Sequence, residues 1–143
     1  MDEIDKEILN ALMDNGRESH ENISKKLNLS RPAVRQRVKR LEEHGIIKRY
    51  EVVVDWGKLG QVIHVFIYLK INSAVVKDII NEIKNINVSS AFLEECHRLA
   101  GEWCLMLKVR STSPQNITQY IDELLKINGV VGTSTTFILS STD

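Results

Sequence analysis

Apolar residues recur three and four positions apart through the first 45 residues, the spacing of helices with one buried face. Asp2, Ser19 and Ser30 can each cap a helix that follows them. About three residues separate the second predicted helix from the third, and this short gap is typical of a helix-turn-helix. The predicted buried positions are Ile4, Ile8, Leu9, Leu12 and Met13 in the first helix, Ile23 and Leu27 in the second, and Ala33, Val34, Val38 and Leu41 in the third.

The pattern changes after Gly45. Residues 46–56 contain a β-branched run, so we predict a strand there that leaves the helical unit and braces the end of the third helix, as in winged helix-turn-helix domains. Residues 55–60 are rich in turn-forming residues and are predicted to form a hinge. We therefore assign residues 1–54 to a helix-turn-helix domain.

A second domain is predicted over residues 61–143. Every odd position from Ile63 to Ile71 is aliphatic, so this face of a strand must lie on a core. The even face is too apolar for open water and favours cover by a second sheet, for example from another subunit. A helix from residue 76, strands at 89–99 and 102–111, a helix capped by Ser113 and a strand at 131–140 follow. This β-α-β-β-α-β order predicts a ferredoxin-like domain, and the fold class is α+β.

The third helix of the first domain has the strongest functional pattern. Five basic residues and no acidic residue lie from Arg31 to Arg40. The apolar residues Val34, Val38 and Leu41 determine which side of the helix faces inward. A helix in the major groove presents its early residues to base edges, where arginine can bind guanine and glutamine can bind adenine. We predict that Arg35 and Gln36 specify bases and that Arg31, Lys39 and Arg40 contact phosphates, with Arg37 flanking them and Ser30 able to donate to a phosphate. The alternative is a basic helix face that is merely solvated.

Other chemistry is not favoured by the composition. Formal net charge is zero, and neither a glycine-rich phosphate loop nor a Ser-His-Asp set is present. Cys96 and His97 are adjacent in a predicted strand and point to opposite faces, so no metal site and no cofactor are expected. The acidic N-terminus is not a signal peptide, and no apolar run approaches the ~18 residues of a membrane span. We expect a cytoplasmic, nucleoid-associated protein.

Short motifs then follow one another along the chain. IDKEIL, NGR, KKLNLS and RVKRLEEHGII lie within residues 4–50, ECHRLAGEWCLMLKVR spans residues 95–110, and INGV spans residues 127–130. In this order they resemble the Lrp/AsnC family of bacterial and archaeal regulators. The resemblance implies double-stranded DNA as a partner and a ferredoxin-like module that binds amino acids. It also implies homodimers, paired sheet against sheet, that assemble further into octamers.

The resemblance further implies an effector site near the loop between the second and third strands of that module. The residues at these positions are Leu99, Gly101, Glu102, Thr133, Ser134 and Thr135. Glycine permits close backbone approach, and the Glu102 carboxylate could hold an ammonium group. The family pattern has a second acid where this chain has Cys104, and a hairpin turn without a ligand is the alternative.

The predicted function is a sequence-specific transcriptional regulator, modulated by an amino acid or another small effector. An architectural protein that wraps DNA with little sequence preference is the first alternative. The second is an enzyme, because some siroheme decarboxylases resemble this family. The intact basic helix argues against an enzyme, which has no need of it.

Overall fold

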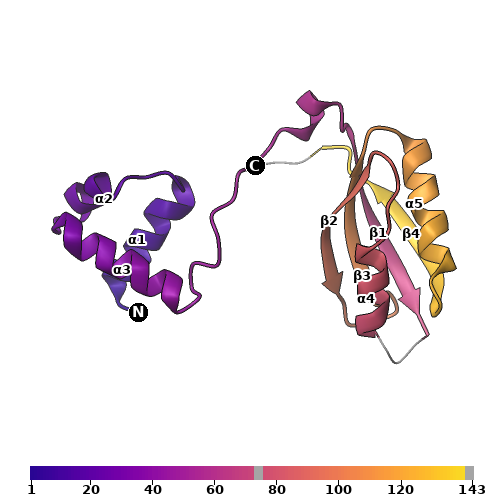
Figure 1. The fold of residues 1–143 in the computed structure, drawn as a ribbon, viewed down its shortest axis with the longest axis horizontal. Coiled ribbons are helices and arrows are strands. Elements are labelled where there is room, and N and C mark those ends of the chain that lie inside the picture. Colours follow the sequence, from indigo (N-terminus) through magenta and orange to yellow (C-terminus); the bar gives the residue numbers. More distant parts are fainter. Residues whose placement is uncertain (73–75, 141–143) are drawn as a thin grey trace. The chain divides into compact units, whose positions relative to one another are not determined.

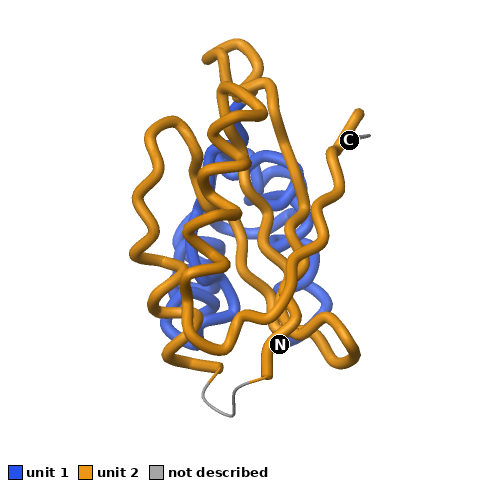
Figure 2. Tube along the Cα trace, turned by 90° about the vertical axis from the view of Figure 1, so that its right-hand side faces the viewer, with its two compact units in different colours: residues 1–54 blue, residues 55–143 orange. Residues whose placement is uncertain are grey.

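The computed structural model describes residues 1–72 and 76–140. The chain divides into two compact units, Met1–Val54 and Asp55–Asp143, which Figure 2 colours separately. None of the helices in the described residues combines the length and apolar composition needed to cross a bilayer. Each unit has a hydrophobic core of its own.

Unit 1 contains three helices, α1 (Glu3–Asp14), α2 (His20–Leu27) and α3 (Arg31–Glu43). The three predicted N-caps are confirmed, because the Asp2, Ser19 and Ser30 side chains each accept a hydrogen bond from the backbone N–H three residues later. Asn28 ends α2 in the left-handed conformation, at φ 55°, which turns the chain tightly into α3. The buried core residues are Ile8, Ile23, Val34, Val38 and Leu41.

Two predictions for unit 1 are wrong. Met13 is 82% exposed, because it lies at the end of α1 beyond the face that meets α2 and α3. The predicted strand over residues 46–56 is absent: this segment has no regular structure until a 3₁₀ helix, η1, at Trp56–Leu59. Val52 and Val53 are 85% and 99% exposed. A strand needs a hydrogen-bonded neighbour, and no other strand of the described chain pairs with this segment.

The end of α3 is nevertheless braced without that strand. The Leu41 carbonyl accepts hydrogen bonds from the N–H groups of Ile46 and Ile47 at 2.9 and 3.1 Å, and Gly45 turns the chain with a φ of 66°. Ile47 then packs against the core of unit 1. A turn, and not the predicted strand, therefore stabilises the end of α3.

Unit 2 has the predicted element order. It consists of β1 (Ile63–Ile71), α4 (Val76–Lys84), β2 (Ala91–Arg98), β3 (Leu105–Ser111), α5 (Pro114–Lys126) and β4 (Val130–Phe137). The antiparallel sheet has the order β2-β3-β1-β4, and both helices cover one of its faces (Figure 1). The βαββαβ prediction, and with it the α+β fold class, is confirmed.

The two faces of β1 differ as its alternation predicts. Val65, Ile67 and Leu69 are fully buried beneath α4 and α5. His64, Phe66 and Tyr68 point to the opposite face and remain partly exposed. At one end of that face the Trp56 ring lies against the Arg110 guanidinium, 3.8 Å from ring centroid to Cζ.

Candidate nucleic-acid interface

Helix α3 presents most of its predicted DNA-binding side chains to solvent. Val34, Val38 and Leu41 face the core, so α3 is held by one stripe. The residues exposed around the rest of the helix and at its cap are Ser30, Arg31, Arg35, Gln36, Lys39 and Arg40, and Arg37 is partly buried. Gln36, Lys39 and Arg40 also line a hollow on the outer side of α3. The structure thus brings these residues together on one accessible helix.

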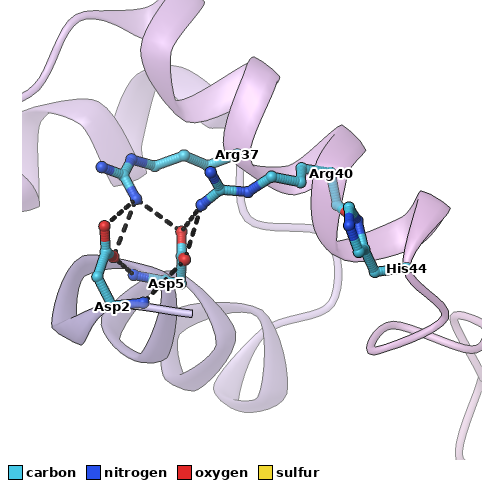
Figure 3. A network of polar contacts seen from close by, with 5 residues as sticks. All are labelled: Asp2, Asp5, Arg37, Arg40 and His44. Carbon is cyan, nitrogen blue, oxygen red and sulfur yellow. Dashed lines mark hydrogen bonds and ion pairs between the residues drawn. The ribbon is translucent and has the colours of Figure 1, made fainter.

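Two of the arginines are ion-paired with α1 (Figure 3). Nη1 of Arg37 donates to both Asp2 oxygens, at 2.9 and 2.7 Å, and to Oδ1 of Asp5 at 2.7 Å. Nη2 of Arg40 donates to both oxygens of Asp5, at 3.0 and 2.8 Å. The Asp5 carboxylate is fully buried and also accepts the Asp2 backbone N–H at 3.1 Å. It therefore joins both arginines to the first turn of α1.

The electrostatics of this cluster follow from its geometry. Burial would raise the pKa of Asp5, but hydrogen bonds from Arg37 and the Asp2 backbone, together with the charges of both arginines, lower it to about 2. The hydrogen bond from Arg37 also lowers the pKa of Asp2. Both carboxylates are ionised at neutral pH, so two positive and two negative charges balance within the cluster.

The expectation that the basic side chains of α3 form no ion pairs with acidic residues is therefore wrong for part of the helix. Asp5 and Arg40 lie 35 positions apart in the sequence, and only the packing of α1 on α3 brings them together. Lys39 also lies 3.5 Å from Glu43, in the next turn of the helix. Within the described residues, Arg31 and Arg35 form no ion pair and keep all their donors available. The local sequence of α3 contains the Lys39–Glu43 pair, but it could not have shown that Arg37 and Arg40 pair with α1.

The predicted effector residues are only partly gathered by unit 2. The loop from Leu99 to Cys104 is closed by a 2.8 Å hydrogen bond from the Leu99 N–H to the Cys104 carbonyl, and Gly101 has a φ of 138°. Glu102 is already paired, because Lys70 Nζ lies 2.8 Å from its carboxylate and lowers its pKa. Sequence analysis missed Lys70 as a member of this site. Its only signal was its place on the even face of the first strand, two residues after Tyr68.

The β4 part of this candidate site does not form one surface. Thr133, Ser134 and Thr135 pair with Leu69, Tyr68 and Ile67 of β1, respectively. Successive strand residues point to opposite faces, so Thr133 and Thr135 share the helix-covered side whereas Ser134 faces the other way. A single ligand on one face of the sheet would meet the two threonines or the serine, but not all three.

Comparison with known proteins decides the family. Residues 1–48 match the family described as winged helix-turn-helix DNA-binding, and residues 64–143 match the Lrp/AsnC ligand binding domain. The chain is 34% identical to the HTH-type transcriptional regulator LrpB of Bacillus subtilis over 126 residues, which cover 88% of this chain and 82% of LrpB. The chain belongs to the Lrp/AsnC family.

Solved structures of other Lrp/AsnC proteins share the architecture. The structure of B. subtilis LrpC matches with a TM-score of 0.86 and 31% identity, covering all of this chain and 97% of LrpC. A Neisseria meningitidis transcriptional regulator, solved as a complex with L-Met, matches with a TM-score of 0.90 and 25% identity over 100% and 92% of the two chains. This Lrp/AsnC protein is thus a DNA-binding transcriptional regulator. The family consists of transcription regulators and not enzymes, which removes the enzyme alternative.

Proposed function

We propose that this regulator recognises a specific DNA sequence by placing α3 in the major groove, with Arg35 and Gln36 on base edges. The observation that carries the proposal is that both side chains are exposed on α3 while Arg35 has no ion pair within the described residues. A free guanidinium can bind the O6 and N7 atoms of guanine, and a glutamine amide can bind adenine in the same two-point manner. Such contacts specify sequence, whereas phosphate contacts only position the protein.

The remaining α3 residues are assigned to the DNA backbone. Arg31 lies at the N-terminal end of the helix, and Lys39 and Arg40 lie between two and three turns later on its exposed side. The Ser30 hydroxyl accepts the Ala33 N–H, which leaves its own hydrogen free to donate to a phosphate. Architectural wrapping would rest almost entirely on phosphate contacts with little sequence preference, and competitor titrations distinguish it from recognition of base edges.

We further propose that the protein acts as a homodimer, or an octamer built from dimers, on the nucleoid in the cytoplasm. The dimer is supported by the sheet face that carries His64, Phe66 and Tyr68, which α4 and α5 leave uncovered. A two-fold pair of α3 helices would read a nearly symmetric DNA site.

An amino acid or another small effector is proposed to bind at the loop from Leu99 to Cys104. The matched family domain is described as ligand-binding, and one related structure contains L-Met. Glu102 could hold the ammonium group of an amino acid and Lys70 its carboxylate, if the ligand separated the present ion pair. A ligand that prefers the folded protein raises its melting temperature, so a thermal screen of the amino acids tests this part, with Glu102→Gln as the matched variant.

Selection of duplexes from a random library, followed by competitor titrations at two salt concentrations, tests the DNA-binding proposal. Replacing Arg35 with alanine should cost about 1–3 kcal/mol of binding free energy and relax the preference at one base pair. Lys39→Ala is the matched control, because loss of a phosphate contact weakens binding to all sequences alike. Unchanged affinity and preference in Arg35→Ala would refute the base-reading role, and selection of no preferred sequence would favour the architectural alternative.

A further inference from the structure

The Arg40 side chain is held at one end only. Both of its contacts with Asp5 use Nη2, at 3.0 and 2.8 Å, and Nε and Nη1 have no partner among the described residues. The side chain is 51% exposed, whereas that of Arg37 is 25% exposed and is bound by Asp2 as well as Asp5. Arg37 also makes its contacts through a single nitrogen, Nη1. The two arginines therefore differ in exposure and in their number of partners: Arg37 is the more buried and contacts two aspartates, and Arg40 is the more exposed and contacts one.

Asp5 is a rigid partner for Arg40. Its carboxylate is fully buried, belongs to the first turn of α1 and is fixed by the Asp2 backbone N–H at 3.1 Å (Figure 3). A long arginine side chain loses rotamer freedom when it binds a ligand, and this loss of conformational entropy weakens binding. In this protein part of that loss has already occurred during folding, because Asp5 holds the guanidinium in one place.

We infer that Asp5 is a positioning residue for DNA binding, which holds Arg40 by Nη2 so that Nε and Nη1 can donate to a backbone phosphate. This inference rests on the proposed role of α3 as the helix that contacts DNA. Arg40 lines the hollow on the outer side of α3 together with Gln36 and Lys39, two side chains that are also proposed to contact DNA. A charged donor pair on a phosphate oxygen is the strong, directional kind of hydrogen bond that benefits from a fixed guanidinium.

The opposite effect is also physically reasonable, and this makes the inference testable. Asp5→Asn removes one negative charge from the protein. If Asp5 only neutralised Arg40, this substitution would make DNA bind more tightly. If Asp5 positions Arg40, the same substitution weakens binding although the net charge becomes more positive. The sign of the change in affinity therefore separates positioning from simple electrostatics.

A double-mutant cycle on the full-length chain measures this. The probe is a fluorescein-labelled duplex of mixed sequence, because phosphate contacts do not depend on sequence. Affinity is compared among the wild type, Asp5→Asn, Arg40→Gln and the double variant, with folding checked by circular dichroism at the assay temperature. We expect each single substitution to weaken binding about tenfold, as for one charged hydrogen-bonded contact, and the double variant to bind as weakly as Arg40→Gln alone.

Asp2→Asn is the matched control. It removes a carboxylate from the same cluster but leaves the contact between Asp5 and Arg40 in place. Its effect on affinity should add to that of Arg40→Gln, in contrast to the non-additivity of Asp5→Asn. A role in folding alone would not produce this difference between the two aspartates.

Arg40→Lys decides the question if Asp5→Asn does not fold. A lysine keeps the charge but has one compact ammonium group, which cannot bind Asp5 and present a fixed pair of donors to a phosphate. We expect Arg40→Lys to lose nearly as much affinity as Arg40→Gln. Wild-type affinity in Arg40→Lys, tighter binding by Asp5→Asn, or additivity in the cycle would each overturn the inference. Failure of the wild type to bind any duplex would instead reject the proposed function of α3, and the inference with it.

Discussion

Different interactions stabilise the interior of each of the two units of this protein. In the described part of unit 2, fourteen buried apolar residues form one core between the sheet and its two helices. Unit 1 has a core of five, and its first and third helices are also joined by a fully buried aspartate and two arginines. A small core leaves more of the stability to individual polar contacts, so unit 1 should respond to charge and unit 2 to packing.

The largest effect is expected from a cavity in unit 2. Leu107→Ala removes a fully buried side chain from the central region of the sheet, and should lower the free energy of unfolding by about 2–5 kcal/mol. Met106→Ala is the matched control, because Met106 points to the partly exposed opposite face of the same strand. Urea denaturation followed by tryptophan fluorescence measures the difference. Equal losses for both variants would show that the two faces of β3 are not distinct.

Acid should affect unit 1 before unit 2. The pKa of Asp5 is about 2 in the folded protein against an ordinary value of 3.8, so its contribution to the stability of unit 1 is complete above about pH 4 and is lost as the pH falls towards 2. Both tryptophans, Trp56 and Trp103, lie in unit 2, so their emission reports that unit alone. We expect helical circular dichroism to fall at higher pH than the pH at which tryptophan emission changes.

Asp5→Asn supplies the control for the acid experiment. It removes the titrating group, so the difference in pH between the circular dichroism transition and the tryptophan transition should become smaller. The variant starts from lower stability because two arginines lose a charged partner. Coincident transitions of both probes in the wild type would show that the buried carboxylate does not govern the acid response of unit 1.

A smaller effect is expected at the cap of α1. Asp2 caps this helix and also binds Arg37, so Asp2→Ala should lower the stability of unit 1 measurably, but by less than Leu107→Ala lowers that of unit 2. Asp2→Asn retains a capping oxygen and loses only the charge, and should cost less. Thermal unfolding followed at 222 nm compares them. If the asparagine variant were as unstable as the alanine variant, the ion pair rather than the cap would dominate.

The smallest effect is expected at the exposed ion pair of unit 2. Lys70 and Glu102 are 48% and 66% exposed, so Glu102→Gln should change the free energy of unfolding very little, and less still at high salt. Urea denaturation at low and high salt measures this. A larger loss would mean that the loop from Leu99 to Cys104 depends on charge as unit 1 does, and would weaken the contrast between the units.

Much of the fold followed from local patterns. The N-caps at Asp2, Ser19 and Ser30 and the alternation of β1 were predicted because each depends on residues close together in the sequence. The candidate DNA-binding residues of α3 were predicted for the same reason, since three inward apolar positions determine which side chains face outward. Sequence patterns were less informative for residues 46–56, because β-branched composition does not supply a neighbouring strand.

By itself, the sequence determined the helical and strand periods, the caps and the order of the elements, because these arise from contacts within a few residues. Only the tertiary structure decided which arginines of α3 remain without an ion pair. Arg37 and Arg40 meet Asp2 and Asp5 because Ile8 and Val34 pack in a common core, which brings together charges more than 30 positions apart. The net charge of a segment can be summed from its sequence, but whether a charged side chain is free to bind a partner depends on the distances to other charges, which packing sets.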